Sequence, residues 1–229
     1  MKNQRPASPA ARFRTPVVIL AGGARGEDRA SSLAAKAVLA PAFARFTGTL
    51  ISGGTTAGIA GVAGALAGAC PGADVIGYLP RRLGGARPDR RYARLYATGG
   101  KGFSEAECLR YWSDLIAAGV QPATVALLGW GGGRIAALEY RIALLLGARV
   151  GIVAGTGRSA DALRKDPRWA RAPRLRFLPP DAAAVRAFVR GRGRPGWFMR
   201  ARETHDALAD SSRMKCRAMA KPPLSMHRR

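Results

Sequence analysis

Short apolar runs alternate with helical patterns along most of this chain. Continuous apolar runs rich in β-branched residues are typical of strands buried on both faces, as in a parallel sheet. Seven such runs predict strands over 16–20, 48–52, 73–80, 93–97, 124–128, 149–154 and 175–178. Helical spacing of apolar residues predicts helices over 29–46, 57–69, 104–118, 134–146 and 181–189, and another that begins within 155–163. The alternation from 16 to 190 predicts an α/β fold, a Rossmann-like, doubly wound and mostly parallel sheet with helices on both faces.

Three of the predicted helices carry a specific expectation about packing. The buried face of the first helix is expected to contain the residues at helical spacing, Leu33, Ala37, Ala40 and Phe43 or Phe46. The third helix is expected to be capped by Ser104 and to bury Leu109, Trp112, Leu115 and Ile116. The helix over 57–69 contains four glycines, each of which costs about 1 kcal/mol relative to alanine. We therefore expect that helix to lie pressed against the sheet.

Glycine-rich turns follow several of the predicted strands and precede helices. In a parallel sheet such turns lie at the carboxyl edge, where ligands bind. Backbone N–H groups at a helix start suit a phosphate, although an ordinary capped helix start has the same composition. The first turn lacks the GxGxxG spacing of a dinucleotide fingerprint, and together the turns predict a phosphate-bearing small ligand. The candidate binding residues are Gly22, Gly23, Gly53, Gly54, Thr55, Thr56, Gly58, Gly131, Gly132, Gly133, Arg134, Glu139, Gly157, Arg158 and Ser159.

The stretch 127–139 is predicted to be the end of a buried strand, a glycine turn and the first turns of a helix. Glu139 is unusual because Ile135, Ile142 and Leu146 share its predicted helix face. A carboxylate on an apolar face beside a glycine turn is either a structural partner or a functional group. Both interpretations remain open on the sequence.

The chain of 229 residues has a formal net charge of +24. This charge indicates either an anionic partner or GC-rich coding, which favours arginine, alanine, glycine and proline. Aromatic residues are few and are not interleaved with the basic runs, so a stacking surface for nucleic acid is not favoured. The basic loop 81–91 is either a lid over an anionic ligand or a solvated loop.

Three widely spaced cysteines give neither metal-ligand spacing nor a disulfide framework, so we expect no metal and a reducing, cytoplasmic compartment. We also expect no cofactor. No apolar run approaches the roughly 18 residues of a membrane span, and no signal-peptide core is present. Residues 1–15 are interpreted as a disordered basic leader, 16–190 as the Rossmann-like domain, and 191–229 as a basic tail or part of an appended module. A homo-oligomer is compatible with this organisation.

Several of these motifs together resemble the SLOG/LOG superfamily. They are GlyGlyThrThrAlaGlyIleAlaGlyValAlaGly (53–64), ValIleGlyTyrLeuPro (75–80) and GlyGlyGlyArgIleAlaAlaLeuGlu (131–139). GlyThrGlyArgSerAlaAspAlaLeu (155–163) looks like a segment of the SLOG domain of melastatin-type TRP channels. The chain is therefore most similar to the prokaryotic TRPM-like SLOG family. The resemblance implies a Rossmann-like sensor domain for a nucleotide-like ligand, with ADP-ribose and NAD relatives as leading candidates.

The same superfamily includes phosphoribohydrolases and a DNA-processing branch. In the hydrolase motif ProGlyGly-x-GlyThr-x-x-Glu, this chain has Gly131 for the proline, Ile135 and Ala136 for the Gly-Thr pair, and a matching Glu139. No ArgLys dipeptide occurs between Pro80 and Gly131, where the hydrolases have one. These departures favour ligand sensing. The alternatives are a nucleoside 5′-monophosphate phosphoribohydrolase with Glu139 as the catalytic residue, and nucleic-acid binding.

Overall fold

The computed structural model describes residues 13–23 and 29–191. Its strands form one seven-stranded sheet in the order β4-β3-β2-β1-β5-β6-β7, and all neighbouring strands pair in parallel. The strands are β1 (Val17–Gly22), β2 (Thr49–Ser52), β3 (Asp74–Pro80), β4 (Arg94–Thr98), β5 (Ala126–Trp130), β6 (Arg149–Val153) and β7 (Leu175–Leu178). The predicted Rossmann-like α/β fold class is confirmed.

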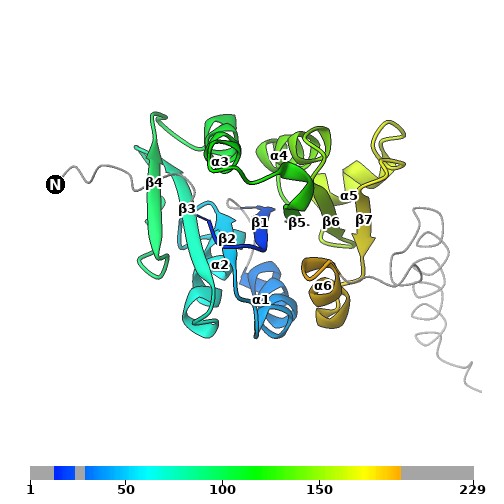
Figure 1. Ribbon diagram of the computed structural model, residues 1–229, viewed down its shortest axis with the longest axis horizontal. Coiled ribbons are helices and arrows are strands. Elements are labelled where there is room, and N and C mark those ends of the chain that lie inside the picture. Colours follow the sequence, from blue (N-terminus) through cyan, green and yellow to red (C-terminus); the bar gives the residue numbers. More distant parts are fainter. Residues whose placement is uncertain (1–12, 24–28, 192–229) are drawn as a thin grey trace, which may run out of the picture.

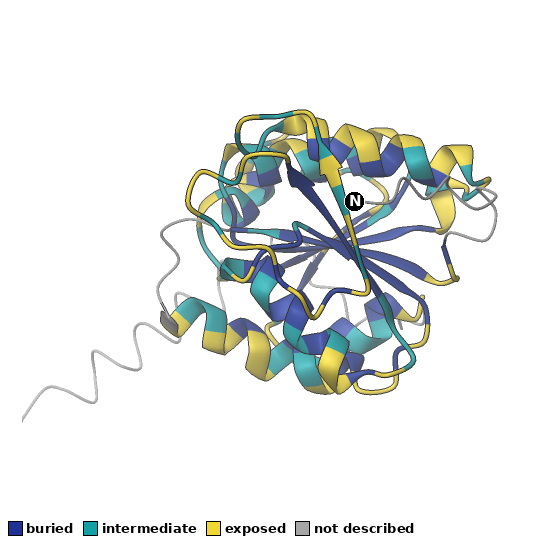
Figure 2. Ribbon diagram, turned by 90° about the vertical axis from the view of Figure 1, so that its left-hand side faces the viewer, coloured by how far each residue is buried: buried dark blue, intermediate teal, exposed yellow. Residues whose placement is uncertain are grey.

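Helices cover both faces of the sheet (Figure 1). Helices α1 (Arg29–Phe43), α2 (Gly58–Ala69) and α6 (Ala182–Val189) pack on one face. Helices α3 (Glu105–Ala117), α4 (Arg134–Leu145) and α5 (Arg158–Lys165) cover the other, and a short 3-10 helix, Pro122–Thr124, precedes β5. Figure 2 shows the buried strands between two helical layers whose outer surfaces are exposed.

The order of the strands determines where a ligand site forms. The chain adds β2, β3 and β4 on one side of β1, then returns through α3 to place β5 on the other side. Strand β1 therefore pairs with both β2 and β5 at the point where the direction of winding reverses. In open parallel sheets the crevice at the carboxyl ends of the strands on either side of this reversal is the usual ligand site.

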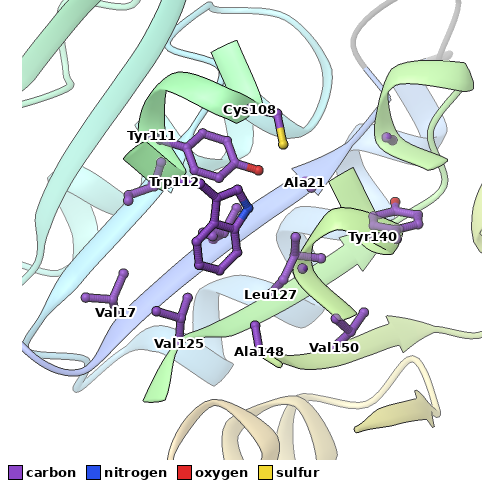
Figure 3. Close-up of a cluster of buried hydrophobic side chains, with 14 of the residues drawn as sticks. Val17, Ala21, Cys108, Tyr111, Trp112, Val125, Leu127, Tyr140, Ala148 and Val150 are labelled. Carbon is purple, nitrogen blue, oxygen red and sulfur yellow. The ribbon is translucent and has the colours of Figure 1, made fainter. Parts of the chain in front are cut away.

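Two of the predicted helix faces are correct only in part. Phe43 in α1 and Trp112 and Leu115 in α3 are buried as predicted. In α1 the buried residues are Ala35, Leu39, Ala42 and Phe43, whereas Leu33 is 57% exposed. In α3 the core face consists of Cys108, Tyr111, Trp112 and Leu115, while Leu109 and Ile116 are half exposed. Apolar residues lie on both faces of these helices, so packing against the sheet, rather than apolar spacing alone, determines which face is buried. Figure 3 shows Tyr111 and Trp112 packed over β1 and β5 in this core.

Helix α2 packs against β1, β2 and β3 of the sheet, as expected. Its apolar residues Ile59, Val62 and Leu66 are buried, whereas two of its glycines have other surroundings. A Cβ atom at Gly64 would lie 2.0 Å from Oδ2 of Asp89, in the loop between β3 and β4, whereas one at Gly68 would meet nothing within 4 Å. Gly64 therefore accommodates the loop rather than the sheet.

Candidate functional site

A pocket of about 620 Å³ opens at the carboxyl edge of the sheet. Its lining comes from the ends of β1 and β2, from Tyr78 in β3, and from the first turns of α2, α3 and α4. Leu83, Gly84 and Ala86 of the loop between β3 and β4 complete it. The pocket therefore lies beside the winding reversal, where the topology places a ligand.

The structure brings eight of the sequence-predicted binding residues to this pocket. They are Gly22, Gly23, Gly53, Thr55, Gly133, Arg134, Glu139 and Arg158. The other seven, Gly54, Thr56, Gly58, Gly131, Gly132, Gly157 and Ser159, are not part of its lining. Hydrogen bonds explain why several of these residues support the pocket walls instead.

The turn at 131–133 is held from behind by the start of α5. Gly131 and Gly132 have φ values of 61° and 90°, which glycine adopts without strain. The Gly131 amide donates to the Thr156 hydroxyl at 2.9 Å, and the Ser159 hydroxyl donates to the Gly133 carbonyl at 2.8 Å. The Ser159 and Ala160 amides donate to the Gly132 and Gly131 carbonyls. The turn that leads into α5 therefore fixes the turn at 131–133, and the Ser159 hydroxyl takes part in that contact.

The turn at 53–58 divides its groups between the pocket and the basic loop. Thr55 is buried and forms an isolated bridge with Pro88, and the Thr56 amide donates to the Arg87 carbonyl at 3.0 Å. The Asp89 amide donates to the Gly54 carbonyl at 2.9 Å. The loop is thus anchored to α2 and the second turn while its tip lines the pocket, so it is more than a solvated loop.

Two arginines lie at the mouth of the pocket. Arg134 is the first residue of α4, whose N-cap, Gly133, supplies no side-chain cap. Arg158 has a φ of 54° and is the one non-glycine residue with positive φ among the described residues. The guanidinium of Arg158 lies close to the α4 start, because a Cβ atom built on Gly133 would be 3.5 Å from its Nη2. A helix start without a side-chain cap, next to two cations, can receive an anionic group.

The N-terminus of α3, by contrast, is already capped. The Ser104 hydroxyl accepts from the Ala106 amide, and the Glu107 carboxylate accepts from the Ser104 amide at 2.8 Å. Glu107 also accepts from the Thr98 hydroxyl. The cap predicted at Ser104 is confirmed, and it makes the start of α3 less suited to an anion than the uncapped start of α4.

Aromatic residues that the sequence analysis did not select form the inner part of the pocket. Tyr78 and Tyr111 line it with ring centroids 5.9 Å apart, together with Phe103. The Tyr111 hydroxyl donates to Oε1 of Glu139 at 3.3 Å, and the Tyr78 hydroxyl donates to Asp114 at 2.9 Å. Tyr111 lies one turn from Cys108 and Leu115, so correct assignment of the buried face of α3 would have identified it.

Glu139 is the titratable group most affected by this environment. Its partly buried side chain lines the pocket, three residues after Ala136 and four before Ala143, at the edge of the core face of α4. Burial raises the pKa of Glu139 to about 7; the hydrogen bond from Tyr111 acts in the opposite direction, and the charge of Glu107 adds to the increase. No arginine pairs with Glu139 among the ion pairs of the described residues. The carboxyl group is therefore partly protonated near neutral pH.

Neighbouring groups show the same effect of burial. Burial raises the pKa of the Cys108 thiol to about 12 and that of the Tyr111 phenol well above its usual range, with the charge of Glu139 adding to both. Cys108 and Tyr111 lie close together on α3 (Figure 3). Among residues 13–23 and 29–191, histidine, cysteine, aspartate and glutamate side chains form no group suited to hold a metal ion.

Comparison with known proteins gives similarity at the level of structure alone. No protein-family model matches the chain, and no curated protein matches it either. The molybdenum cofactor carrier protein of Chlamydomonas reinhardtii is similar with a TM-score of 0.57 and 19% identity, over 78% of this chain and 98% of the carrier. The molybdenum cofactor binding protein of the phototrophic bacterium Rippkaea orientalis gives 0.54 and 16%, over 74% of this chain and 93% of that one.

The chain has the fold of these proteins. At such low identity the likeness extends to the Rossmann-like architecture that the SLOG/LOG resemblance implied, and it does not distinguish a TRPM-like subfamily. Within the described residues, no helix has both the length and the apolar character needed to span a membrane. The predicted leader and tail fall largely outside the described residues.

Proposed function

We propose that this protein binds a small phosphate-bearing ligand of nucleotide size in the pocket at the carboxyl edge. The observation that carries the proposal is the convergence of the α4 start with Arg134 and Arg158 in one cavity. Charge-assisted hydrogen bonds from guanidinium groups and backbone amides are strong contacts for phosphate oxygens. The left-handed backbone at Arg158 adds support, because strained residues that persist often serve a ligand site.

Two ligands fit this proposal at a finer level. The first is an ADP-ribose- or NAD-related nucleotide, recognised by a sensor domain of the TRPM-like SLOG type, as the sequence resemblance implies. The second is a pterin of the molybdenum cofactor type, which also carries phosphate. It is favoured by structural neighbours described as carrying or binding that cofactor. A cavity of about 620 Å³ is of a suitable size for either molecule.

Phosphoribohydrolase activity is a weaker proposal. Glu139 would have to act as a carboxylate on the ribose, but its pKa of about 7 keeps much of it protonated at neutral pH. Assay of free-base release from nucleoside monophosphates tests this alternative. Release that is abolished by Glu139→Gln would establish it over simple binding.

Calorimetric titration with ADP-ribose tests the main proposal. We expect saturable binding, and a loss of about tenfold or more in affinity for Arg158→Ala, because a charge-assisted contact to phosphate is removed. Arg171→Ala is the matched control, since Arg171 is exposed and is not part of the pocket lining. If Arg171→Ala weakens binding as much as Arg158→Ala does, the pocket is not the site.

A further inference from the structure

The pocket has two chemically different ends along the wall formed by α4. Arg134 begins the helix, and Glu139 follows five residues later. At a rise of 1.5 Å per residue, Glu139 lies about 7.5 Å further along the helix axis than Arg134. Tyr111 is likewise well inside α3, which begins at Glu105. A ligand with its phosphate at the arginines would therefore extend its other end toward Glu139 and Tyr111.

The inner end suits a flat ring. Tyr78, Tyr111, Ile19 and Ala136 line it with aromatic and apolar surface. Two carboxyl groups belong to the pocket lining, and they differ in availability. Glu107 accepts from the Thr98 hydroxyl and the Ser104 amide, which fixes it as part of the α3 cap. Glu139 accepts from Tyr111 through Oε1, which orients its carboxyl group at the pocket wall.

We propose that Glu139, as a neutral carboxylic acid, recognises the ring of the ligand through an exocyclic amine and the ring nitrogen beside it. Oε1, which accepts from Tyr111, is the carbonyl oxygen and has a second lone pair for the amine N–H. The O–H on Oε2 donates to the ring nitrogen. Adenine presents this pair of groups, and so does the aminopyrimidine ring of a pterin. Glu139 is thus a specificity-determining residue, and this assignment depends on the proposed ligand class.

The surroundings of Glu139 favour the neutral form. Helix α3 presents Glu107, Cys108 and Tyr111, and β3 presents Tyr78, so none of these neighbours contributes a positive charge. The described cations of the pocket, Arg134 and Arg158, belong to the starts of α4 and α5 at its mouth. A ring that displaces water from this end removes solvation from a carboxylate, which strengthens the preference for the acid.

The pH dependence of ADP-ribose affinity tests this assignment, because the two phosphates of this ligand keep the same charge between pH 6 and pH 8.5. Only the protonated fraction of Glu139 binds, so the apparent Kd should rise about 30-fold over this range. Glu139→Gln keeps one donor and one acceptor in the same shape, so it should bind equally at both pH values. Glu139→Ala should bind at least tenfold more weakly at pH 6, with thermal melts confirming that both variants fold.

Tyr111→Phe tests the positioning role of the tyrosine. Its hydrogen bond lowers the pKa of Glu139, so its removal should move the midpoint of the pH dependence upward while affinity at pH 6 changes little. A second titration, with 6-hydroxymethylpterin diphosphate at pH 6, shows whether the site prefers a pterin or an adenine ring. The ligand that binds more tightly, this one or ADP-ribose, identifies the preferred ring, and the affinity for either should fall in Glu139→Ala.

Three outcomes would overturn the inference. Affinity that rises with pH, together with loss of binding in Glu139→Gln, would assign an ionised Glu139 to ribose hydroxyls. Binding that depends on Arg158 but on neither pH nor Glu139 would leave the proposed function intact and remove the ring-recognition role. Absence of binding by either probe would remove both proposals.

Discussion

Glu139 shows how the environment of a single residue sets its chemistry. Its hydrogen-bond partner, Tyr111, precedes it by 28 positions and belongs to another helix. The sequence identifies Glu139 as unusual because apolar residues flank it at helical spacing. The sequence does not reveal Tyr111, because the pairing depends on how α3 and α4 lie side by side on the sheet. The apolar neighbours used to select Glu139, Ile135 and Ile142, are themselves only partly buried.

The raised pKa of Glu139 predicts a pH-dependent cost in stability. Below pH 4.5 the group is protonated in both the folded and the unfolded state and costs nothing. As pH rises to about 7 the unfolded state ionises first, so stability falls, and the full cost is present above pH 7. Glu139→Gln should therefore stabilise the protein by about 2 kcal/mol more at pH 8 than at pH 5. Urea unfolding at the two pH values measures this, with exposed Glu105→Gln as the control for the change of charge.

At the scale of elements, the sequence predicts the strands and helices well and their contacts less well. Each predicted strand is present within a few residues of its expected ends, because continuous apolar runs between glycine turns are a local signal. Helix faces depend on partners that are distant in sequence. The loop between β3 and β4 is the clearest case, since Arg91 pairs with Asp89 and donates to the Gly61 carbonyl of α2 at 3.1 Å. The sequence of α2 alone does not predict that contact.

Two glycines of α2 provide a matched test of this packing. Gly64→Ala would place a methyl group against Asp89, which Arg91 holds in place, so we expect a loss of about 1–3 kcal/mol from overpacking. Gly68→Ala meets no neighbour and should stabilise the protein by about 0.5–1 kcal/mol through helix propensity. Chemical denaturation measures both. Equal effects of the two substitutions would mean that the loop does not pack on α2 as described.

At the scale of the whole molecule, the sheet order explains why segments far apart in the sequence form one pocket. The glycine turns after β1, β2 and β5 each follow a strand. Because the strands are parallel, all three turns lie at the carboxyl edge of the sheet and meet there. The aromatic wall of the pocket cannot be predicted from the strand pattern in the same way. It depends on the path of α3, which crosses from the edge strand β4 back to the centre of the sheet. The net charge of +24 adds a further question, since a molecule so basic attracts any polyanion. Nucleic-acid binding therefore remains a separate prediction from pocket binding.

Thermal unfolding with two kinds of anion separates pocket binding from general charge attraction. A ligand that binds the folded state at 100 times its Kd adds about 2.7 kcal/mol of stability, which corresponds to a rise in Tm of about 5–10 °C for a chain of this size. We expect ADP-ribose to raise Tm at both 0.05 M and 0.5 M salt, and Arg158→Ala to remove most of the rise. Any stabilisation by a short DNA duplex should disappear at 0.5 M salt, because it arises from counterion release. A Tm increase with DNA that persists at high salt, beside no effect of ADP-ribose, would instead favour the nucleic-acid alternative.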